Sequence, residues 1–472
     1  MPSAGELQQM QFGGGVSASV FSPVVLIAIV LAGILVLILP RHNAIIPFLA
    51  AALLVPTDQI LVIGQLHFPM LRVLLVFGFV RMLMGKLGGK GEILTGGVSG
   101  LDMVVIALSA FTALDGVLLW KETGVVVYQL GVMYTSLGTY FLLRYLIRDE
   151  EDLKRTIRVW ACVAVVIAGI MIGEELTRKN VLYMAIGGAR ATFAAVVDVR
   201  DGSVRARGPF QHPILAGTFG GFSLPLFLEL WWRGKADRKF GVLGSIASVV
   251  TTLAASSSTA LMGGLGGILG LCFWPLRRKM RLVRWGIVGV LAAGHLYMKS
   301  PVWHLIFDID FTGSSSSYHR YMLVDECIRH FWEWVLVGTK NWGTWGWMMW
   351  DLSNQYVATA DTAGLIPLIS FLAILVFGFK YLGRARRTVE GDRRLELFIW
   401  AMGASLFGHL VAFFGITYFD QTSVCWYALL AMISAATLSA RRAEMANESP
   451  TEAQPHFELH PALQSGSVEL LK

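Results

Sequence analysis

Residues 174–212 carry six basic side chains against four acidic ones, in a chain that is otherwise poor in charge. The basic residues are Arg178, Lys179, Arg190, Arg200, Arg205 and Arg207. A guanidinium group binds phosphate oxygens in a bidentate way, and arginine keeps its charge even in a partly dry cleft. The segment could therefore hold an anion such as a phosphate. The alternative is a long translocated loop whose charges have no ligand.

Residues 299–362 combine aromatic and acidic side chains. Seven of the 15 tryptophans of the chain lie here, at positions Trp303, Trp332, Trp334, Trp342, Trp345, Trp347 and Trp350. The acidic residues are Asp308, Asp310, Asp325, Glu326, Glu333, Asp351 and Asp361. Tryptophans beside a membrane usually anchor the protein at its surface. The other interpretation is a sugar-binding platform, since a pyranose ring packs its apolar face on an indole while carboxylates bind its hydroxyls.

The composition is that of a protein with many membrane-spanning helices. Hydrophobic residues make up 55% of the 472 positions and charged residues only 15%, whereas soluble domains contain about 25% charged residues. The net charge of +7 is spread over short clusters, which argues against a nucleic-acid partner. The four cysteines are isolated, so no metal site and no disulfide framework is expected, and no cofactor motif is found.

A spanning helix needs about 20 mostly apolar residues. Thirteen ranges approach this pattern: 23–39, 44–63, 69–84, 101–120, 125–146, 157–173, 213–232, 241–256, 259–274, 283–298, 364–381, 395–416 and 422–439. The two ranges that flank His67 are short and contain prolines. We therefore predict an all-α polytopic integral membrane protein with about 12–13 transmembrane helices. Asp102 and Asp115 fall near the ends of two spans and are expected to be solvated boundary charges.

Short basic clusters alternate with the spans and favour the cytoplasmic side. They lie at Arg81, Lys86 and Lys90, and at 148–158, 233–239, 277–284, 384–394 and 441–442. The two long segments, 174–212 and 299–362, are then extracytoplasmic loops. The predicted order is an N-terminal segment (1–22), a first helical bundle (23–173), the first large loop, central helices (213–298), the second large loop, C-terminal helices (363–440) and a disordered cytoplasmic tail (441–472).

Four short patterns resemble those of the O-antigen ligase and O-antigen polymerase superfamily. The sequence RARGPFQHPILAG at 205–217 resembles a family signature that opens a helix after an outer loop. The sequence SSSTAL at 256–261 resembles a helix junction of the family, although the arginine of that pattern is absent. Arg320 followed by WVLVG at 334–338, and Asn354 with Gly364, resemble its second outer loop. The resemblance covers about residues 205–366.

This resemblance implies transfer of a glycan from an undecaprenyl-diphosphate carrier to a sugar hydroxyl, by a metal-independent inverting displacement. It places the chain in a bacterial inner membrane, with the reaction on the outer face, for surface or exopolysaccharide or lipopolysaccharide synthesis. The partners are then the lipid-linked glycan donor, a glycan or lipid-linked acceptor, membrane lipids and other polysaccharide-assembly proteins. Arg207 and Arg320 would stabilise the leaving diphosphate, with Arg205 in support.

The acceptor hydroxyl must also lose a proton, and here the chain departs from the family. The ligases have a histidine immediately before the asparagine, and this position is Ser353. Serine is a poor base. Asp351, His319 and Asp361 are the candidate bases. Residues expected to line the substrate site are Arg205, Gln211, His212, Ser353, Asn354 and Asp361.

Other interpretations of the same residues remain open at this point. His319 could simply bind its own loop, and Asp351 could cap the helix that follows it. Gln211 and His212 could be an ordinary helix entrance, although a helix N-terminus also attracts phosphate. At the level of function, the alternatives are a transporter or flippase of a lipid-linked glycan, and an inactive family member that acts as a scaffold.

Overall fold

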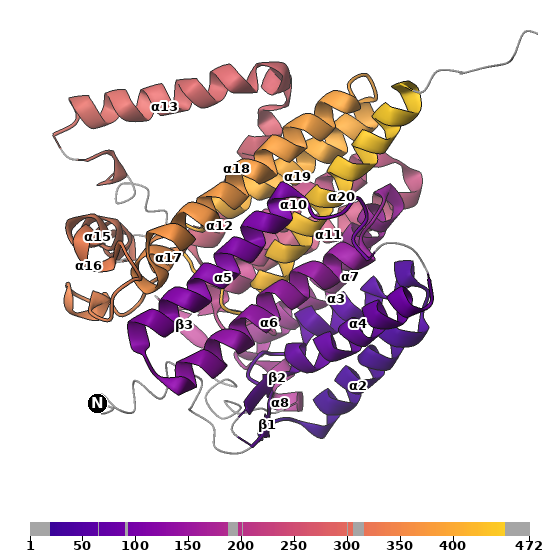
Figure 1. Ribbon diagram of the computed structural model, residues 1–472, viewed down its shortest axis with the longest axis horizontal. Coiled ribbons are helices and arrows are strands. Elements are labelled where there is room, and N and C mark those ends of the chain that lie inside the picture. The colour runs from indigo at the N-terminus through magenta and orange to yellow at the C-terminus, as the bar shows by residue number, and fades with distance from the viewer. Residues whose placement is uncertain are drawn as a thin grey trace, which may run out of the picture.

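The structure is a computed structural model that describes residues 19–64, 66–89, 93–186, 197–200, 202–299, 301–304 and 316–448. The described part is almost entirely helical (Figure 1). Its longer helices are α2 (Pro23–Ile38), α3 (Ile45–Leu54), α4 (Met70–Leu87), α5 (Gly100–Trp120), α6 (Thr123–Leu146), α7 (Glu150–Thr177), α10 (Pro213–Arg233), α11 (Lys235–Ala254), α12 (Ser258–Cys272), α13 (Met280–Tyr297), α18 (Leu365–Thr388), α19 (Arg393–Ala412) and α20 (Thr422–Glu448).

Shorter elements occupy the loops. They are α8 (Val181–Ile186), α15 (Ser316–Arg329), α16 (Phe331–Trp334), α17 (Gln355–Ala363) and the 3-10 helices η1 (Arg41–Asn43), η2 (Trp274–Lys279), η3 (Val302–His304) and η4 (Trp342–Thr344). Two antiparallel hairpins pair β1 (Ile60–Ile63) with β2 (Leu66–Pro69) and β3 (Asp198–Arg200) with β4 (Ser203–Arg205).

Six of the described helices, α5, α6, α7, α10, α18 and α19, are long and apolar enough to cross a membrane. The pair formed by α12 and the segment η2–α13, bent by 71°, is a seventh if it counts as one broken span. Helices shorter than a full span also contribute apolar surface at 23–38, 41–54 and 422–438. A helix overlaps every one of the thirteen predicted ranges. The prediction of an all-α, multi-pass membrane protein is confirmed.

Two helix ends differ most from the prediction. The expected helix 44–63 ends at Leu54, and residues 60–63 belong to a hairpin. Pro56 follows the last turn of α3, and the β-branched run that comes next favours an extended chain. At the other end of the chain, α20 continues to Glu448, so the helix extends into the predicted tail. Good helix formers such as Ala, Arg, Glu and Met make up this extension.

Four of the basic clusters, at 148–158, 233–239, 277–284 and 384–394, gather at one end of the bundle, which we call the basic end. Ion pairs join them to one another or to a neighbouring residue: Arg158 to Asp237 at 2.6 Å, Arg233 to Glu150 at 3.2 Å, Arg278 to Glu390 at 2.8 Å and Arg277 to Glu396 at 3.0 Å. The guanidinium of Arg233 also lies 4.2 Å from the ring of Phe398, which links α10 to α19. These four segments, which the sequence predicts to face the cytoplasm, therefore share one end of the molecule.

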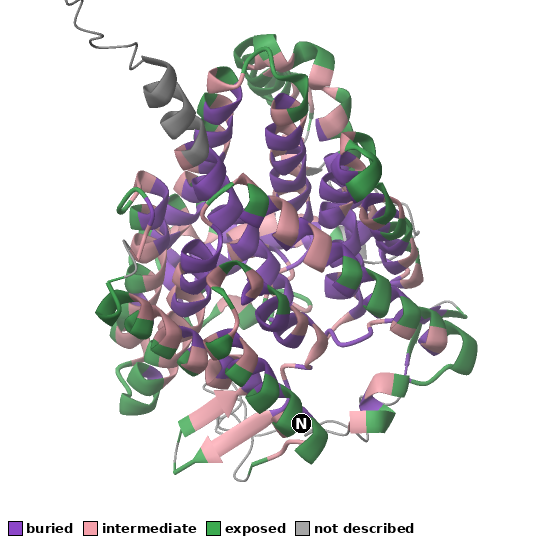
Figure 2. Cartoon of the chain, turned by 90° about the vertical axis from the view of Figure 1, so that its right-hand side faces the viewer, coloured by how far each residue is buried: buried purple, intermediate pink, exposed green. Residues whose placement is uncertain are grey.

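Helix α10 lies at the centre of the bundle, and 78% of its most apolar 18-residue stretch is buried. Glycines allow its close packing. A Cβ atom on Gly221 would lie 2.8 Å from the carbonyl oxygen of Ala260 and 2.8 Å from the amide nitrogen of Gly264, both on α12. Such small residues let helix backbones approach each other in membranes. Buried residues line the inner faces of the helices, as Figure 2 shows.

Helix α13 is the exception, because none of its residues is buried. It projects away from the bundle in Figure 1. The side chains of Leu282, Trp285, Val290 and Leu296 are all strongly exposed.

Asp102 corrects a sequence-based expectation. Its carboxylate is fully buried and pairs with Arg144 of α6 at 3.1 Å, while Tyr140 donates a hydrogen bond to it. Asp102 also forms a capping box with Ser99 at the start of α5. Asp115 is buried as well, so neither residue is a solvated boundary charge. The position near a helix end was visible in the sequence, but the partner on another helix was not.

Candidate functional site

The loop 205–212 lies at the end of the bundle opposite the basic end, which we call the loop end. Its first half is held by Glu174, at the last turn of α7. The carboxylate of Glu174 accepts the backbone N–H of Arg207 at 2.8 Å and that of Gly208 at 3.0 Å. Gly208 has φ +57, a left-handed conformation that suits glycine. The side-chain amide of Asn180 donates to the carbonyl of Gly208 at 3.0 Å.

The second half of the loop is held by the turn between α19 and α20. The backbone N–H of Gln211 donates to Asp420 at 3.1 Å, and the side-chain amide of Gln421 donates to the carbonyl of Pro209 at 2.8 Å. Gln421 also donates to the carbonyl of Val55, which ties in the chain after α3. Burial raises the pKa of Asp420 to about 6, and hydrogen bonds from Thr422 and Gln211 oppose that rise.

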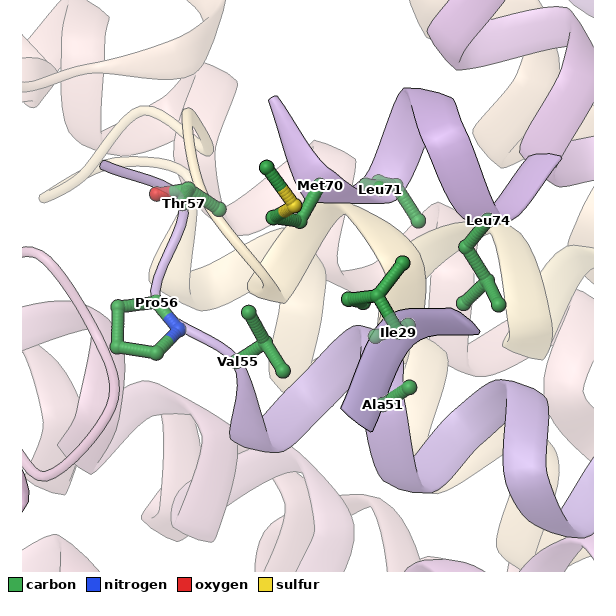
Figure 3. Close-up of a pocket in the computed structure, with 9 residues that line it drawn as sticks. Ile29, Ala51, Val55, Pro56, Thr57, Met70, Leu71 and Leu74 are labelled. Atoms are coloured by element: carbon green, nitrogen blue, oxygen red, sulfur yellow. The ribbon is translucent and has the colours of Figure 1, made fainter. Parts of the chain in front are cut away.

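An apolar pocket opens beside this loop (Figure 3). Helices α2, α3 and α4 form it, and Thr57 supplies the polar side chain of its lining. The Gln211 side-chain amide donates a hydrogen bond to the Thr57 hydroxyl. The lining residues are Ile29, Ala51, Ala52, Val55, Pro56, Thr57, Met70, Leu71 and Leu74. The interior of the pocket has room for about one water molecule, which is too small for a sugar ring or a lipid chain.

The three predicted residues Arg205, Arg207 and His212 lie close together on this loop. Arg205 is nearly buried and donates to Asp198 at 2.9 Å across the β3–β4 hairpin. The guanidinium of Arg207 lies 5.5 Å from the ring of Tyr183. His212 is the N-cap of α10, where its Nδ1 accepts the N–H of Ile214 at 3.2 Å. Burial and then the charge of Arg205 lower the pKa of His212 to about 4, so the imidazole is neutral at physiological pH.

Arg320 of α15 reaches the junction between α11 and α12. Its guanidinium donates to the hydroxyl of Thr259 at 2.8 Å and to that of Ser258 at 3.4 Å. The loop 205–212 approaches the same junction from another side, because the N–H of Ala206 donates to the carbonyl of Ala254 at 2.9 Å. The two arginine motifs, distant in sequence, therefore flank one junction at the loop end.

His319 and Asp351 meet at the carbonyl of Met348. The Nε2–H of His319 donates to it at 3.1 Å, and the backbone N–H of Asp351 donates to it at 3.0 Å. Met348 has φ +56, which is unusual for a residue other than glycine and turns its carbonyl toward both groups. Burial raises the pKa of Asp351, and nearby His319 opposes this rise.

Asp351 is not the cap of the following helix. Asn354 is the N-cap of α17, and its side-chain oxygen accepts the N–H groups of Tyr356 at 3.0 Å and Val357 at 3.2 Å. The alternative that Asp351 caps this helix is therefore wrong. The side-chain oxygen of Asn354 is therefore used to cap the helix. Ser353 beside it is half-buried.

Asp361 lies apart from Asp351 and His319, in the small core between α15 and α17. Its side chain is fully buried. Within the part of the chain that the structure describes, no nitrogen or oxygen atom bonds its carboxylate oxygens, and the thiol of Cys327 is the polar group that faces it. Burial raises the pKa of Asp361 to about 7. Enclosure of this kind is unfavourable for a base that must meet a substrate.

The sequence did not single out Glu174, Asn180, Asp420 or Gln421 as site residues. They fix the loop 205–212 from segments far away in the chain, and no local pattern reveals such partners. Among the described residues, no group of three or more His, Cys, Asp or Glu side chains is arranged to hold a metal ion.

Comparison with known proteins leaves the family open. No protein-family model matches the chain, and no curated protein matches it.

Proposed function

We propose that this chain is a membrane glycosyltransferase of the O-antigen ligase or polymerase kind, which transfers or polymerises a glycan from an undecaprenyl-diphosphate carrier. The reaction would take place on the outer face of a bacterial inner membrane, in surface or exopolysaccharide synthesis. One observation carries the proposal: the loop of Arg207 and the side chain of Arg320 flank the same α11–α12 junction. An arrangement of this kind suits a diphosphate, which needs several preorganised cations.

The contact of Arg320 offers a reason for one departure from the family pattern, the arginine that is missing from the helix junction. In the SSSTAL junction, Thr259 stands at the position of the missing arginine. The guanidinium of Arg320 lies against this threonine. A positive charge is thus supplied to the junction from α15, which supports a role for Arg320 toward the leaving group.

The displacement proceeds in one step in this proposal. The acceptor oxygen attacks the anomeric carbon of the donor, and the bond from that carbon to the diphosphate oxygen breaks. The electron pair goes to the diphosphate, where Arg207 and Arg320 stabilise the charge. The acceptor proton goes to Asp351. Burial raises the pKa of this carboxylate, and a higher pKa makes a carboxylate a stronger base.

The test is glycan transfer by the purified protein in liposomes that contain the lipid-linked donor. Arg207→Ala and Arg320→Ala should each abolish the product while the amount of folded protein stays normal. Arg320→Lys should restore only part of the activity, because lysine lacks the bidentate fork. Arg329→Ala is the matched control, since Arg329 lies on the same helix with an exposed side chain paired to Asp325. Full activity of Arg320→Ala would remove this residue from the site.

A further inference from the structure

Trp347 and Trp350 expose their indole rings beside the candidate base. They lie in the turn after η4, and 57% and 69% of their surfaces are exposed. The ring of Trp347 meets that of His319 edge-on, with 6.5 Å between the centroids. Asp351 follows Trp350 directly in the chain. Two large aromatic surfaces therefore border the His319 and Asp351 pair.

The turn that carries these rings is firmly held. Met349, between the two tryptophans, is fully buried in the small core of α15–α17 with Leu323 and Val357. The Met348 carbonyl is fixed by His319 and by the N–H of Asp351. Because its backbone is pinned at these two residues, the turn presents the indoles outward in a defined position.

Other tryptophans of this segment have different surroundings. Trp334 is buried and donates its indole N–H to the carbonyl of Cys327 at 2.7 Å. Trp345 stacks on His330 with 4.4 Å between centroids. Trp332 is exposed, but one helical turn after it lies Leu336, which is also exposed. An exposed Trp and Leu pair is typical of a contact with the membrane surface.

The polar groups beside Trp347 and Trp350 favour a different ligand. Asp351 carries negative charge when ionised, and it would repel the anionic head groups of membrane lipids. A sugar, by contrast, offers an apolar C–H face to an indole and hydroxyl groups to a carboxylate. The combination of exposed indole rings and Asp351 therefore matches a carbohydrate.

We propose that Trp347 and Trp350 form the platform on which the acceptor glycan stacks, so that its reacting hydroxyl is directed toward Asp351. This inference rests on the proposed transferase function and assigns a place to the second substrate. The donor lies on the arginine side of the site, and the acceptor lies on the tryptophan side.

The experiment uses the full chain in lipid nanodiscs. The probe is a mixture of oligosaccharides released by mild acid from the surface polysaccharide of the source cells, and binding is followed by saturation-transfer NMR. The double variant Trp347→Ala/Trp350→Ala should bind the oligosaccharides at least about tenfold more weakly, as expected for the loss of two aromatic contacts. Trp332→Ala, the matched control, should bind them normally. Trp350→Phe should retain most of the binding, because it keeps an aromatic face.

Kinetics separate this inference from the function on which it rests. In the transfer assay the double variant should raise the KM for the acceptor about tenfold or more and leave the KM for the donor unchanged. Unchanged oligosaccharide binding and an unchanged acceptor KM would overturn the platform while leaving the arginine-dependent transfer intact. Equal losses in Trp332→Ala and in the double variant would also overturn it, in favour of anchoring at the membrane surface. Tryptophan-dependent binding without any transfer by the wild type would instead contradict the proposed function alone.

Discussion

Asp351 is the residue that removes the proton in the proposed reaction. Asp351→Asn keeps the shape of the side chain and removes its charge, so the turnover number should fall by orders of magnitude while donor binding is kept. The base acts in its ionised form, and burial raises its pKa. The wild-type rate should therefore fall as the pH is lowered through this raised pKa. A pH profile of turnover, measured in liposomes, checks the assignment.

Ser353→Ala is the control for this prediction, because the half-buried serine is two residues away and should affect turnover only mildly. His319→Ala separates the two candidates at the Met348 carbonyl. An active Asp351→Asn together with an inactive His319→Ala would transfer the role of base to the histidine. Activity in both variants would mean that no side chain of this pair removes the proton.

Single residues show what the sequence could predict at the loop end. Residue type and motif spacing led to Arg207, Arg320 and Asp351 as candidate site residues, and this choice stays a prediction. The sequence could not show that Glu174 and Asp420 hold the loop 205–212 by its backbone N–H groups, because a hydrogen bond to backbone leaves no pattern in the partner segment. The sequence also suggested Asp351 as a helix cap, whereas Asn354 has that role; both residue types are favoured caps, so residue type alone does not distinguish them.

The contact between α10 and α12 is the element-level feature that positions the α11–α12 junction. A Cβ atom at Gly221 would meet the backbone of α12 at 2.8 Å, and backbone atoms cannot move aside as a flexible side chain can. Gly221→Ala should therefore destabilise the fold by about 1–3 kcal/mol, the usual cost of overpacking. The melting temperature in detergent, followed by size-exclusion chromatography after heating, measures this loss.

Gly286 of α13 provides the matched control. It is also a glycine inside a helix, but no atom lies within 4 Å of a Cβ atom built on it. Gly286→Ala should leave the melting temperature unchanged or raise it slightly, because alanine favours a helix. Equal melting temperatures for Gly221→Ala and the wild type would show that α10 and α12 are not so closely packed.

Hydropathy predicted the helices well and the turns poorly. An apolar run specifies burial in lipid or protein, and a helix accordingly lies on each predicted range. The run at 44–63 contains a second signal, since Pro56 and the β-branched residues after it direct the chain into the β1–β2 hairpin. The 71° bend between α12 and α13 has no counterpart in the hydropathy pattern, because direction depends on packing and not on composition.

At the scale of the whole molecule, the two ends of the bundle should lie on opposite sides of the membrane. In a variant whose four native cysteines are replaced, a cysteine at exposed Ser203 should react with an impermeant maleimide added to intact cells. A cysteine at exposed Arg387, at the basic end, should react only after the membrane is permeabilised. The expected difference follows from the preference of basic clusters for the cytoplasm. The reverse labelling pattern would exclude a transferase that acts on the outer face.

The hydrogen bonds that hold the loop 205–212 also set an order of assembly during synthesis. Gln211 and its partner Asp420 are 209 residues apart. Ribosomes add about 5–20 residues per second, so the glutamine emerges roughly 10–40 s before the aspartate exists. Until then the loop has its contacts to Glu174 and Asn180, which precede it in the chain. A nascent chain that stops at the end of α19 therefore contains every arginine of the site yet lacks the groups that fix its second half, and the loop is fully held only when the turn between α19 and α20 has been made.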